Sequence, residues 1–306
     1  MKKLNNILNK KVPLGIFLAS LFVMAALVYS FGYHMAMEKF NSIVGYTHEK
    51  QKNYSKLSEV DYNVREGYIG EFNEDKLSDA MCSGYMRGLG GNSKFLSSAD
   101  YKSYVNEQEN LSGEINSQFL QNDIGLIKCA CLGKNFSVNF IDSLNKLISE
   151  GAVGVVIDLR GVSSGTENEV FKTLEYISPK GDILKKVDAS GKEVVVCSSS
   201  GTGSTVKFAV LTDDKTSGIA EAFVSALKDS CKAKHVGVET AGNAVHMKVV
   251  NLSDDSVIVF PDAFYVSSSG KKFFKKGITP EISVTNKSAD EDAQLGKAVA
   301  SLSESK

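Results

Sequence analysis

The chain has 306 residues, of which 42% are hydrophobic and 23% are charged. This balance is ordinary for a globular protein with one sizeable domain or two small ones. Residues 1–33 hold four lysines and no acid, so the remaining 31 of the 35 basic residues face all 36 acidic residues, a net charge of −5. The acidic body argues against nucleic acid as a partner, because phosphate binding needs a basic face.

Residues 12–33 contain no charged side chain and are long enough to cross a hydrocarbon core of roughly 30 Å. Four lysines precede this segment, so the positive-inside rule places the N-terminus in the cytoplasm and the body outside the cell membrane. We therefore predict a single-pass membrane anchor. A cleaved signal peptide is the alternative, but its apolar region would be shorter, and Met35, Ala36 and Met37 make a poor cleavage site.

Two short regions lead from the anchor to the main domain. Residues 34–66 are polar and are expected to form a juxtamembrane stalk. Residues 67–122 are expected to form a small helical segment. In it, Asn73 can cap a helix that begins near Glu74, and Ser97 or Ser98 can cap a second helix over residues 99–109.

The cysteines and histidines predict neither a disulfide framework nor a metal site. The five cysteines are odd in number and irregular in spacing, no CxxC pair occurs, and the four histidines do not cluster. Small buried thiols are the simplest interpretation. No cofactor is expected.

From residue 123 to residue 303 the sequence predicts an α/β domain. Strands are expected at residues 124–132, 153–159, 206–212, 235–240, 247–252, 256–261 and 263–268, and helices at residues 140–150, 170–177, 219–227 and 290–302. The alternation of strands and helices predicts parallel pairing with right-handed crossovers. Working groups in such sheets lie at the carboxyl ends of the strands, which directs attention to residues 158–165 and 213–218.

Four segments in this part of the chain carry recognisable motifs. They are VGVVIDLRGVSSG (153–165), FAVLTDDKTSGIAEAFVSALKD (208–229), HVGVETAGNAV (235–245) and SSGKKFFKKGITPEISV (268–284). In this order they resemble motifs of the C-terminal processing (tail-specific) serine peptidases. The resemblance implies a ClpP/crotonase-like peptidase core, a mixed β-sheet with crossover helices. It also implies a serine nucleophile activated by a neutral lysine.

The residues expected to carry this chemistry are replaced. Aligning Glu221 with the helix glutamate of the family places Gly218 at the nucleophile position. Aligning residues 237–242 with the following motif places Asn243 at the lysine position and Met247 at the position of a supporting glutamine. Glycine offers no nucleophile and asparagine no basic nitrogen, so the resemblance implies a peptidase fold without its catalytic dyad.

Two further departures bear on function. In the oxyanion loop, Ser163, Ser164 and Gly165 stand where the family has PGG, and Gly165 could still present an amide. The PDZ domain that family members commonly carry is missing, because few residues separate Tyr104 from the first core strand. The usual device for capturing a substrate's C-terminus is therefore absent.

Three functions remain open from the sequence. The first is a pseudoenzyme that binds a peptide or protein segment without cutting it. The second is an active, divergent serine peptidase in which Ser217 acts as nucleophile, although on a helix its side chain would point about 100° away from the family position. The third is a structural component of an envelope complex.

Overall fold

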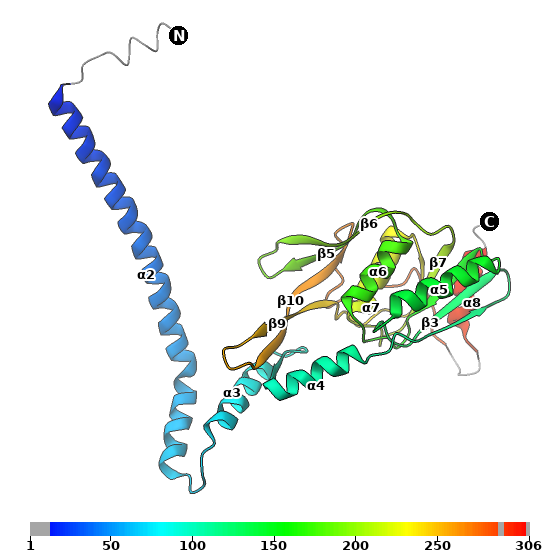
Figure 1. Cartoon of the computed structure of the whole chain (residues 1–306), viewed down its shortest axis with the longest axis horizontal. Helices are drawn as coiled ribbons and strands as arrows, with labels where there is room; N and C mark the ends of the chain where they lie inside the picture. Colours follow the sequence, from blue (N-terminus) through cyan, green and yellow to red (C-terminus); the bar gives the residue numbers. More distant parts are fainter. Residues whose placement is uncertain (1–12, 287–290, 304–306) are drawn as a thin grey trace. The chain divides into compact units, whose positions relative to one another are not determined.

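The computed structural model describes residues 13–286 and 291–303, and the chain divides into two compact units, Met1–Phe72 and Asn73–Lys306. In the first unit, α2 (Leu14–Gly67) is one continuous helix (Figure 1). The expected boundary between anchor and stalk at residue 33 is thus a change of composition, and the helix continues through it. Its part Leu14–Asn41 has a mean hydropathy of 2.2, and by length and composition it fits a membrane span or a signal sequence.

The second unit begins with the two capped helices that the sequence predicts. Asn73 caps α3 (Glu74–Gly88) by accepting a hydrogen bond from the Lys76 amide, and Ser97 caps α4 (Ser98–Glu109) in the same way. Between them lies β1 (Lys94–Leu96), a three-residue strand that the sequence analysis did not predict. The segment expected to be helical therefore also contributes a strand to the body.

A mixed six-stranded sheet forms the centre of the second unit. Its strand order is β11-β8-β7-β4-β3-β2, and every neighbouring pair is parallel except β2 with β3. The strands are β2 (Ile115–Phe119), β3 (Ile124–Cys129), β4 (Gly154–Asp158), β7 (Lys207–Thr212), β8 (Lys234–Gly237) and β11 (Ile282–Ser283). The predicted parallel pairing is confirmed.

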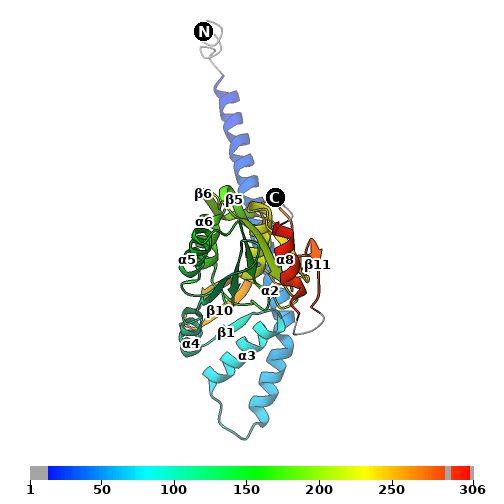
Figure 2. The same cartoon turned by 90° about the vertical axis from the view of Figure 1, so that its right-hand side faces the viewer.

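Helices cover both faces of this sheet, which explains the unbroken apolar runs of its central strands. On one face, α5 (Phe136–Ser149) and α7 (Ile219–Ser230) enclose the main core, and α6 (Glu167–Ile177) packs beside them (Figure 1). On the other face lies α8 (Ala293–Ser303), shown in red in Figure 2. In β4, Val155 and Ile157 face the main core, whereas Val156 faces α8.

The late strands form a second, antiparallel sheet. It has the order β1-β10-β5-β6, with β9 also paired to β10, and contains β5 (Pro179–Asp188), β6 (Glu193–Thr202), β9 (Val245–Asn251) and β10 (Val257–Ser267). The two strands predicted at residues 256–261 and 263–268 are one, β10. Pro261 does not end the strand, because the register shifts between Pro261 and Ala263 and such irregularities tolerate proline.

A partly buried ion-pair cluster links α8 to the sheet. The Arg160 guanidinium donates to the Asp158 carboxylate at the end of β4 and to the Asp292 carboxylate just before α8. Asp158 is almost fully buried. The paired guanidinium lowers the pKa of Asp292 to about 2. Arg160, which lies in the motif segment 153–165, thus links the end of β4 to the residue before α8.

His235 at the start of β8 is buried in its neutral form. The Thr212 hydroxyl donates to the Val238 carbonyl at 2.7 Å, so it accepts a hydrogen bond from His235 Nε2, also at 2.7 Å. His235 Nδ1 is then free to accept from the Lys228 ammonium at 3.1 Å. Burial, and secondly the Lys228 charge, lower the pKa of His235 to about 3.

Because His235 is buried in its neutral form, we expect the folded protein to lose stability in mild acid. The unfolded chain binds a proton at His235 below an ordinary pKa of roughly 6.5, whereas the folded chain does not until about pH 3. The stabilisation is therefore complete above pH 6.5 and falls by up to about 1.4 kcal/mol per pH unit as the pH decreases toward 3. Urea unfolding between pH 7 and 4 should show this slope. His235→Gln should flatten it, whereas replacement of the exposed His34 should not. An unchanged slope in His235→Gln would contradict the assignment.

Candidate active site

The loops that follow β4 and β7 are tied together at the carboxyl edge of the six-stranded sheet. The Ser217 amide donates to the Val162 carbonyl at 3.0 Å, and the Thr216 hydroxyl donates to the Leu159 carbonyl at 2.9 Å. Both loops were predicted to carry working groups. Their mutual hydrogen bonds fix residues 163–165 beside the start of α7.

Glu221, in the first turn of α7, organises the next part of the site. Its side chain is completely buried. Its carboxylate accepts hydrogen bonds from the amides of Gly218 (3.2 Å), Gly242 (2.6 Å) and Asn243 (2.7 Å) and from the hydroxyl of Thr240 (2.5 Å). Charge-assisted bonds of this kind are among the strongest in proteins. They hold the loop of Asn243 against the N-terminus of α7.

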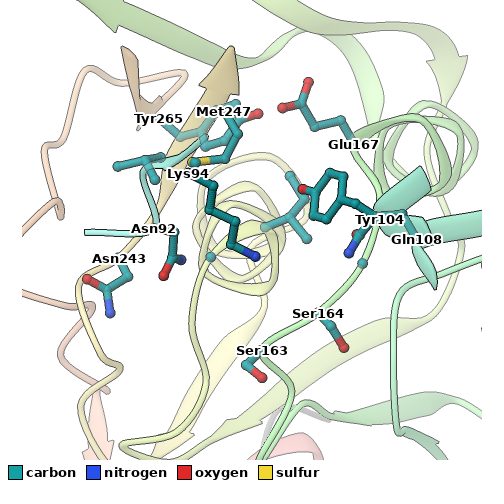
Figure 3. Close-up of a pocket in the computed structure, with 14 residues that line it drawn as sticks. Asn92, Lys94, Tyr104, Gln108, Ser163, Ser164, Glu167, Asn243, Met247 and Tyr265 are labelled. Carbon is teal, nitrogen blue, oxygen red and sulfur yellow. The ribbon is translucent and has the colours of Figure 1, made fainter. Parts of the chain in front are cut away.

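These elements enclose a pocket of about 440 Å³, shown in Figure 3. Six predicted site residues line it: Ser163, Ser164, Gly165, Gly218, Asn243 and Met247. The structure thus brings together the oxyanion loop and the positions that the resemblance assigned to the nucleophile, the lysine and the glutamine. Which role these positions play in this chain stays a prediction.

Ser217, the alternative nucleophile, is not among the pocket-lining residues. Its amide is engaged with Val162, and its hydroxyl has no hydrogen-bond partner within residues 13–286 and 291–303. The nearby Lys215 and Lys248 are exposed and likewise do not line the pocket. Among the described residues, no lysine or histidine nitrogen is hydrogen-bonded to the Ser217 hydroxyl.

Gly165 allows the oxyanion loop to approach the neighbouring strand closely. A Cβ atom at this position would lie 2.5 Å from Leu132 Cβ, so a larger residue would push the loop away. Gly165 and Ile219 both line the pocket, and neither backbone amide donates a hydrogen bond to any part of the chain that the structure describes. Two backbone amides of the pocket lining are therefore without an acceptor in the described part of the chain.

The serine hydroxyls of the oxyanion loop are not activated. Ser164 Oγ donates to Cys131 Sγ at 3.4 Å, and Ser163 is exposed to solvent. Neither hydroxyl is hydrogen-bonded to a lysine or histidine nitrogen within the described ranges. The five cysteines are free, and burial raises the pKa of Cys129 and Cys197. In residues 13–286 and 291–303 no group of His, Cys, Asp and Glu side chains is arranged to hold a metal ion.

The remaining wall of the pocket comes from residues that the sequence analysis did not identify. The N-terminal part of the unit supplies Asn92, Lys94 of β1, and Tyr104 and Gln108 of α4. They reach the site because β1 pairs with the first residues of β10, Lys94 opposite Val259. A three-residue strand carries no periodic signal, so the sequence alone offered no means of finding them.

Tyr265 of β10 adds an unsatisfied hydroxyl to the lining. The residue is only 1% exposed, and its hydroxyl has no hydrogen-bond partner in the described part of the chain. Burial, followed by the charge of the neighbouring Glu167 carboxylate, raises the pKa of Tyr265. A buried hydroxyl without a partner is costly, which marks this position as one where a ligand atom would be favourable.

The sheet, its crossover helices and this pocket define a peptidase-like α/β protein. Residues 123–284 match the profile of peptidase family S41, and the chain belongs to that family. Curated relatives include the carboxy-terminal processing protease CtpA of Bacillus subtilis (25% identity) and the chloroplastic C-terminal processing peptidase of Tetradesmus obliquus (24%). The matches cover 54% and 52% of this chain but only 36% and 34% of those relatives. The chain thus spans about a third of their length.

Solved structures of the same fold are similar over a larger part of the chain. A lipoprotein from Streptococcus agalactiae aligns with a TM-score of 0.61 and 19% identity, covering 76% of this chain and 83% of that one. A photosystem II D1 C-terminal processing protease aligns with a TM-score of 0.52 and 21% identity, covering 62% and 52%. At these identities the likeness concerns the fold, and it confirms the predicted α/β architecture.

Proposed function

We propose that this chain is a membrane-tethered member of peptidase family S41 that binds an extended peptide or protein segment without cleaving it. The single observation that carries the proposal is the composition of the pocket. Gly218 and Asn243, at the positions of the family's serine and lysine, line it together with the oxyanion loop. A site that keeps its enclosure and amide donors but lacks the family's nucleophile and base at their positions can bind a substrate-like segment and leave it intact.

The free edge of β9 in the second sheet favours a ligand that binds in an extended conformation. Within the described residues β9 pairs only with β10, so its other edge presents unpaired main-chain groups. Val245 and Met247 of this strand line the pocket. An extended segment added alongside β9 would gain main-chain hydrogen bonds and pass over the pocket. Only residues 110–114 connect α4 and β2, so no inserted domain lies between them. In the proposal, the free edge of β9 therefore binds the ligand in place of such a domain.

Tethering rests on α2. Residues 14–41 have the length and hydropathy of a membrane span, and lysines precede them. In the proposed arrangement residues 12–33 cross the cell membrane, the N-terminus is cytoplasmic and the body lies outside. The full-length chain should stay in the membrane fraction after an alkaline carbonate wash, whereas a shortened chain in the supernatant would indicate a cleaved signal peptide.

Binding without hydrolysis can be tested with the full chain in detergent micelles and a pool of fluorescein-labelled decapeptides. Saturable binding by fluorescence anisotropy is expected, with the peptides intact by mass spectrometry. Met247→Arg should weaken binding at least about tenfold, because it places a desolvated charge in the pocket. Val194→Arg is the matched control, since Val194 is an exposed residue of β6 and lies neither in the pocket nor on β9. Cleaved peptides would favour a divergent peptidase, and absence of binding would overturn the proposal.

A further inference from the structure

His246 of β9 lies where three other elements meet. Its Nδ1 atom is 2.6 Å from Asp262 Oδ1 of β10, and its Nε2 atom is 3.2 Å from Lys186 Nζ of β5. The same Nε2 atom is 3.8 Å from Glu167 Oε1 in the first turn of α6. The imidazole therefore faces one charged group from each element packed around it.

An irregularity in β10 brings Asp262 to the imidazole. Pro261 lies opposite Met247 and Ala263 lies opposite His246, so Asp262 is an extra residue between two paired ones. Such a bulge redirects a side chain, and here the carboxylate reaches the neighbouring strand.

The two short distances determine where the neutral imidazole carries its proton. A carboxylate accepts hydrogen bonds, so Nδ1 of His246 donates to Asp262. An ammonium donates, so the unprotonated Nε2 accepts from Lys186. His235 has the opposite arrangement, since its Nε2 donates and its Nδ1 accepts.

A second proton on His246 would change one of its partners. The imidazolium cannot accept from the Lys186 ammonium, and two positive charges at 3.2 Å repel each other. The Glu167 carboxylate, at 3.8 Å from the same nitrogen, can accept from it instead. Histidine is the side chain whose ordinary titration falls between pH 5 and 8, so a modest change of pH is sufficient.

Other charged groups on the same strands do not compete with Glu167. On β9, Lys248 is exposed and forms no ion pair among the described residues. On β5, the Asp188 carboxylate accepts hydrogen bonds from the Ser190 hydroxyl and the Lys192 amide. Glu167 is therefore the acceptor nearest to a protonated Nε2.

This exchange of partners would act on the pocket. Glu167 lines it and follows Gly165 of the oxyanion loop by two residues, and Met247 lines it beside His246 on β9. Figure 3 shows the Glu167 carboxylate turned toward Met247. A hydrogen bond from His246 to Glu167 would connect the start of α6 to β9 and draw two walls of the pocket together.

We propose that His246 is a pH-dependent switch whose protonation exchanges Lys186 for Glu167 and thereby tightens the pocket on a bound segment. The effect on binding rests on the proposed function and deepens it. The exchange of partners does not require a ligand, so the two parts can be tested separately.

Nuclear magnetic resonance of the full chain in detergent micelles, labelled with ¹⁵N-histidine, tests the exchange. The chain has four histidines, and the spectrum of His246→Gln assigns the signal. At pH 8 we expect a proton on Nδ1 of His246 and on Nε2 of His235, and at pH 5 both nitrogens of His246 should be protonated. A proton on Nε2 of His246 at pH 8 would overturn the proposal.

Variants of the two exchanging partners supply the sign. Lys186→Met should raise the pH at which His246 takes up its second proton, and Glu167→Gln should lower it, each by about half a pH unit or more. Lys180→Met on β5 and Glu175→Gln on α6 are the matched controls, exposed residues outside the cluster, and should leave this pH unchanged. No change in Lys186→Met or in Glu167→Gln would overturn the exchange.

The effect on the pocket is measured with fluorescein-labelled decapeptides that contain no histidine, aspartate or glutamate. At equal ionic strength, the full chain should bind them about fivefold more tightly at pH 5.5 than at pH 7.5. His246→Gln and Glu167→Gln should bring this ratio close to one, and Glu175→Gln should retain it.

The outcomes separate this inference from the function on which it rests. Equal binding at both pH values, with the exchange of partners intact, would overturn the switch and leave peptide binding standing. A ratio that survives in His246→Gln would overturn the role of His246. Failure of every peptide to bind at either pH would overturn the proposed function, while the tautomer and the variant shifts would still decide the exchange.

Discussion

The double variant Gly218→Ser, Asn243→Lys is expected to react covalently with a fluorophosphonate probe, whereas the unchanged chain is expected not to react. Both positions line the same pocket, so the variant places a hydroxyl and an amine in one site. The space at Gly218 is open, because the nearest atom to a Cβ at this position would be the Ser163 carbonyl oxygen at 3.7 Å. The positive φ of 66° at Gly218 will strain a serine by roughly 1–3 kcal/mol, which lowers stability without preventing the fold.

The pH dependence of labelling provides a second, independent readout. Asn243 is exposed, so a lysine introduced there should keep an ordinary pKa of roughly 10.4 and be mostly protonated at neutral pH. Only the neutral amine can accept the serine proton, and labelling should rise about tenfold per pH unit between pH 7 and 9. Gly218→Ser alone should react on the order of 10²-fold more slowly, since it lacks the base.

Two results would contradict the assignment of these positions. Labelling of the unchanged chain would reveal a nucleophile elsewhere, and mass spectrometry of the adduct would locate it. If the adduct lay on Ser217 and vanished in Ser217→Ala, the chain would be an active, divergent peptidase. A folded but unreactive double variant would mean that residues 218 and 243 do not face each other as the family dyad does.

Replacing Glu221 by leucine is expected to destabilise the second unit by roughly 4 kcal/mol or more. The substitution removes a fully buried acceptor and leaves the amides of Gly218, Gly242 and Asn243 and the Thr240 hydroxyl without a partner. Each unsatisfied buried donor costs about 1–3 kcal/mol, partly recovered where water can enter. Losses of this size are exceptional among single substitutions and follow from such networks.

Urea unfolding followed by near-UV circular dichroism measures this effect in a chain that has tyrosine but no tryptophan. Glu221→Gln keeps one acceptor oxygen and should cost about half as much. Glu167→Gln is the matched control, an acid in the first turn of α6 whose side chain is 40% exposed, and it should cost less than about 1 kcal/mol. Equal effects at both positions would show that the Glu221 network does not hold the site together.

Local signals in the sequence were sufficient for much of the fold. The caps Asn73 and Ser97, the apolar run of β4 and the alternation of strands and helices each reflect interactions between residues close in the chain. Errors arose where a longer-range contact overrode the local signal. Residues 256–261 and 263–268 were expected to form two strands, but pairing with β9 and a register shift carry β10 through Pro261.

The residues of the site show the same contrast between local signals and long-range contacts. Residues 163–165, 218 and 243 could be located because they follow strands whose carboxyl ends meet at one edge of a sheet, and because motifs of a known family mark them. Residue 247 lies within β9, and only the motifs mark it. Lys94 and Tyr104 could not, since their part of the chain is joined to the pocket by the pairing of β1 with β10. Tyr265 could not, since the place of its strand beside the pocket depends on pairing with β5 and β9. β1 has three residues and no pattern of its own.

The sequence by itself determined the apolar N-terminal helix, the α/β domain and the prediction that Gly218 and Asn243 stand at the positions of the family's dyad. All of these depend on residue identity and on short-range periodicity. The tertiary structure alone decided what now fills the pocket, because contacts between residues 92–108 and residues 163–265 depend on non-local strand pairing, which leaves no local pattern. It places Lys94, Tyr104 and the buried Tyr265 in the same pocket as Gly218 and Asn243.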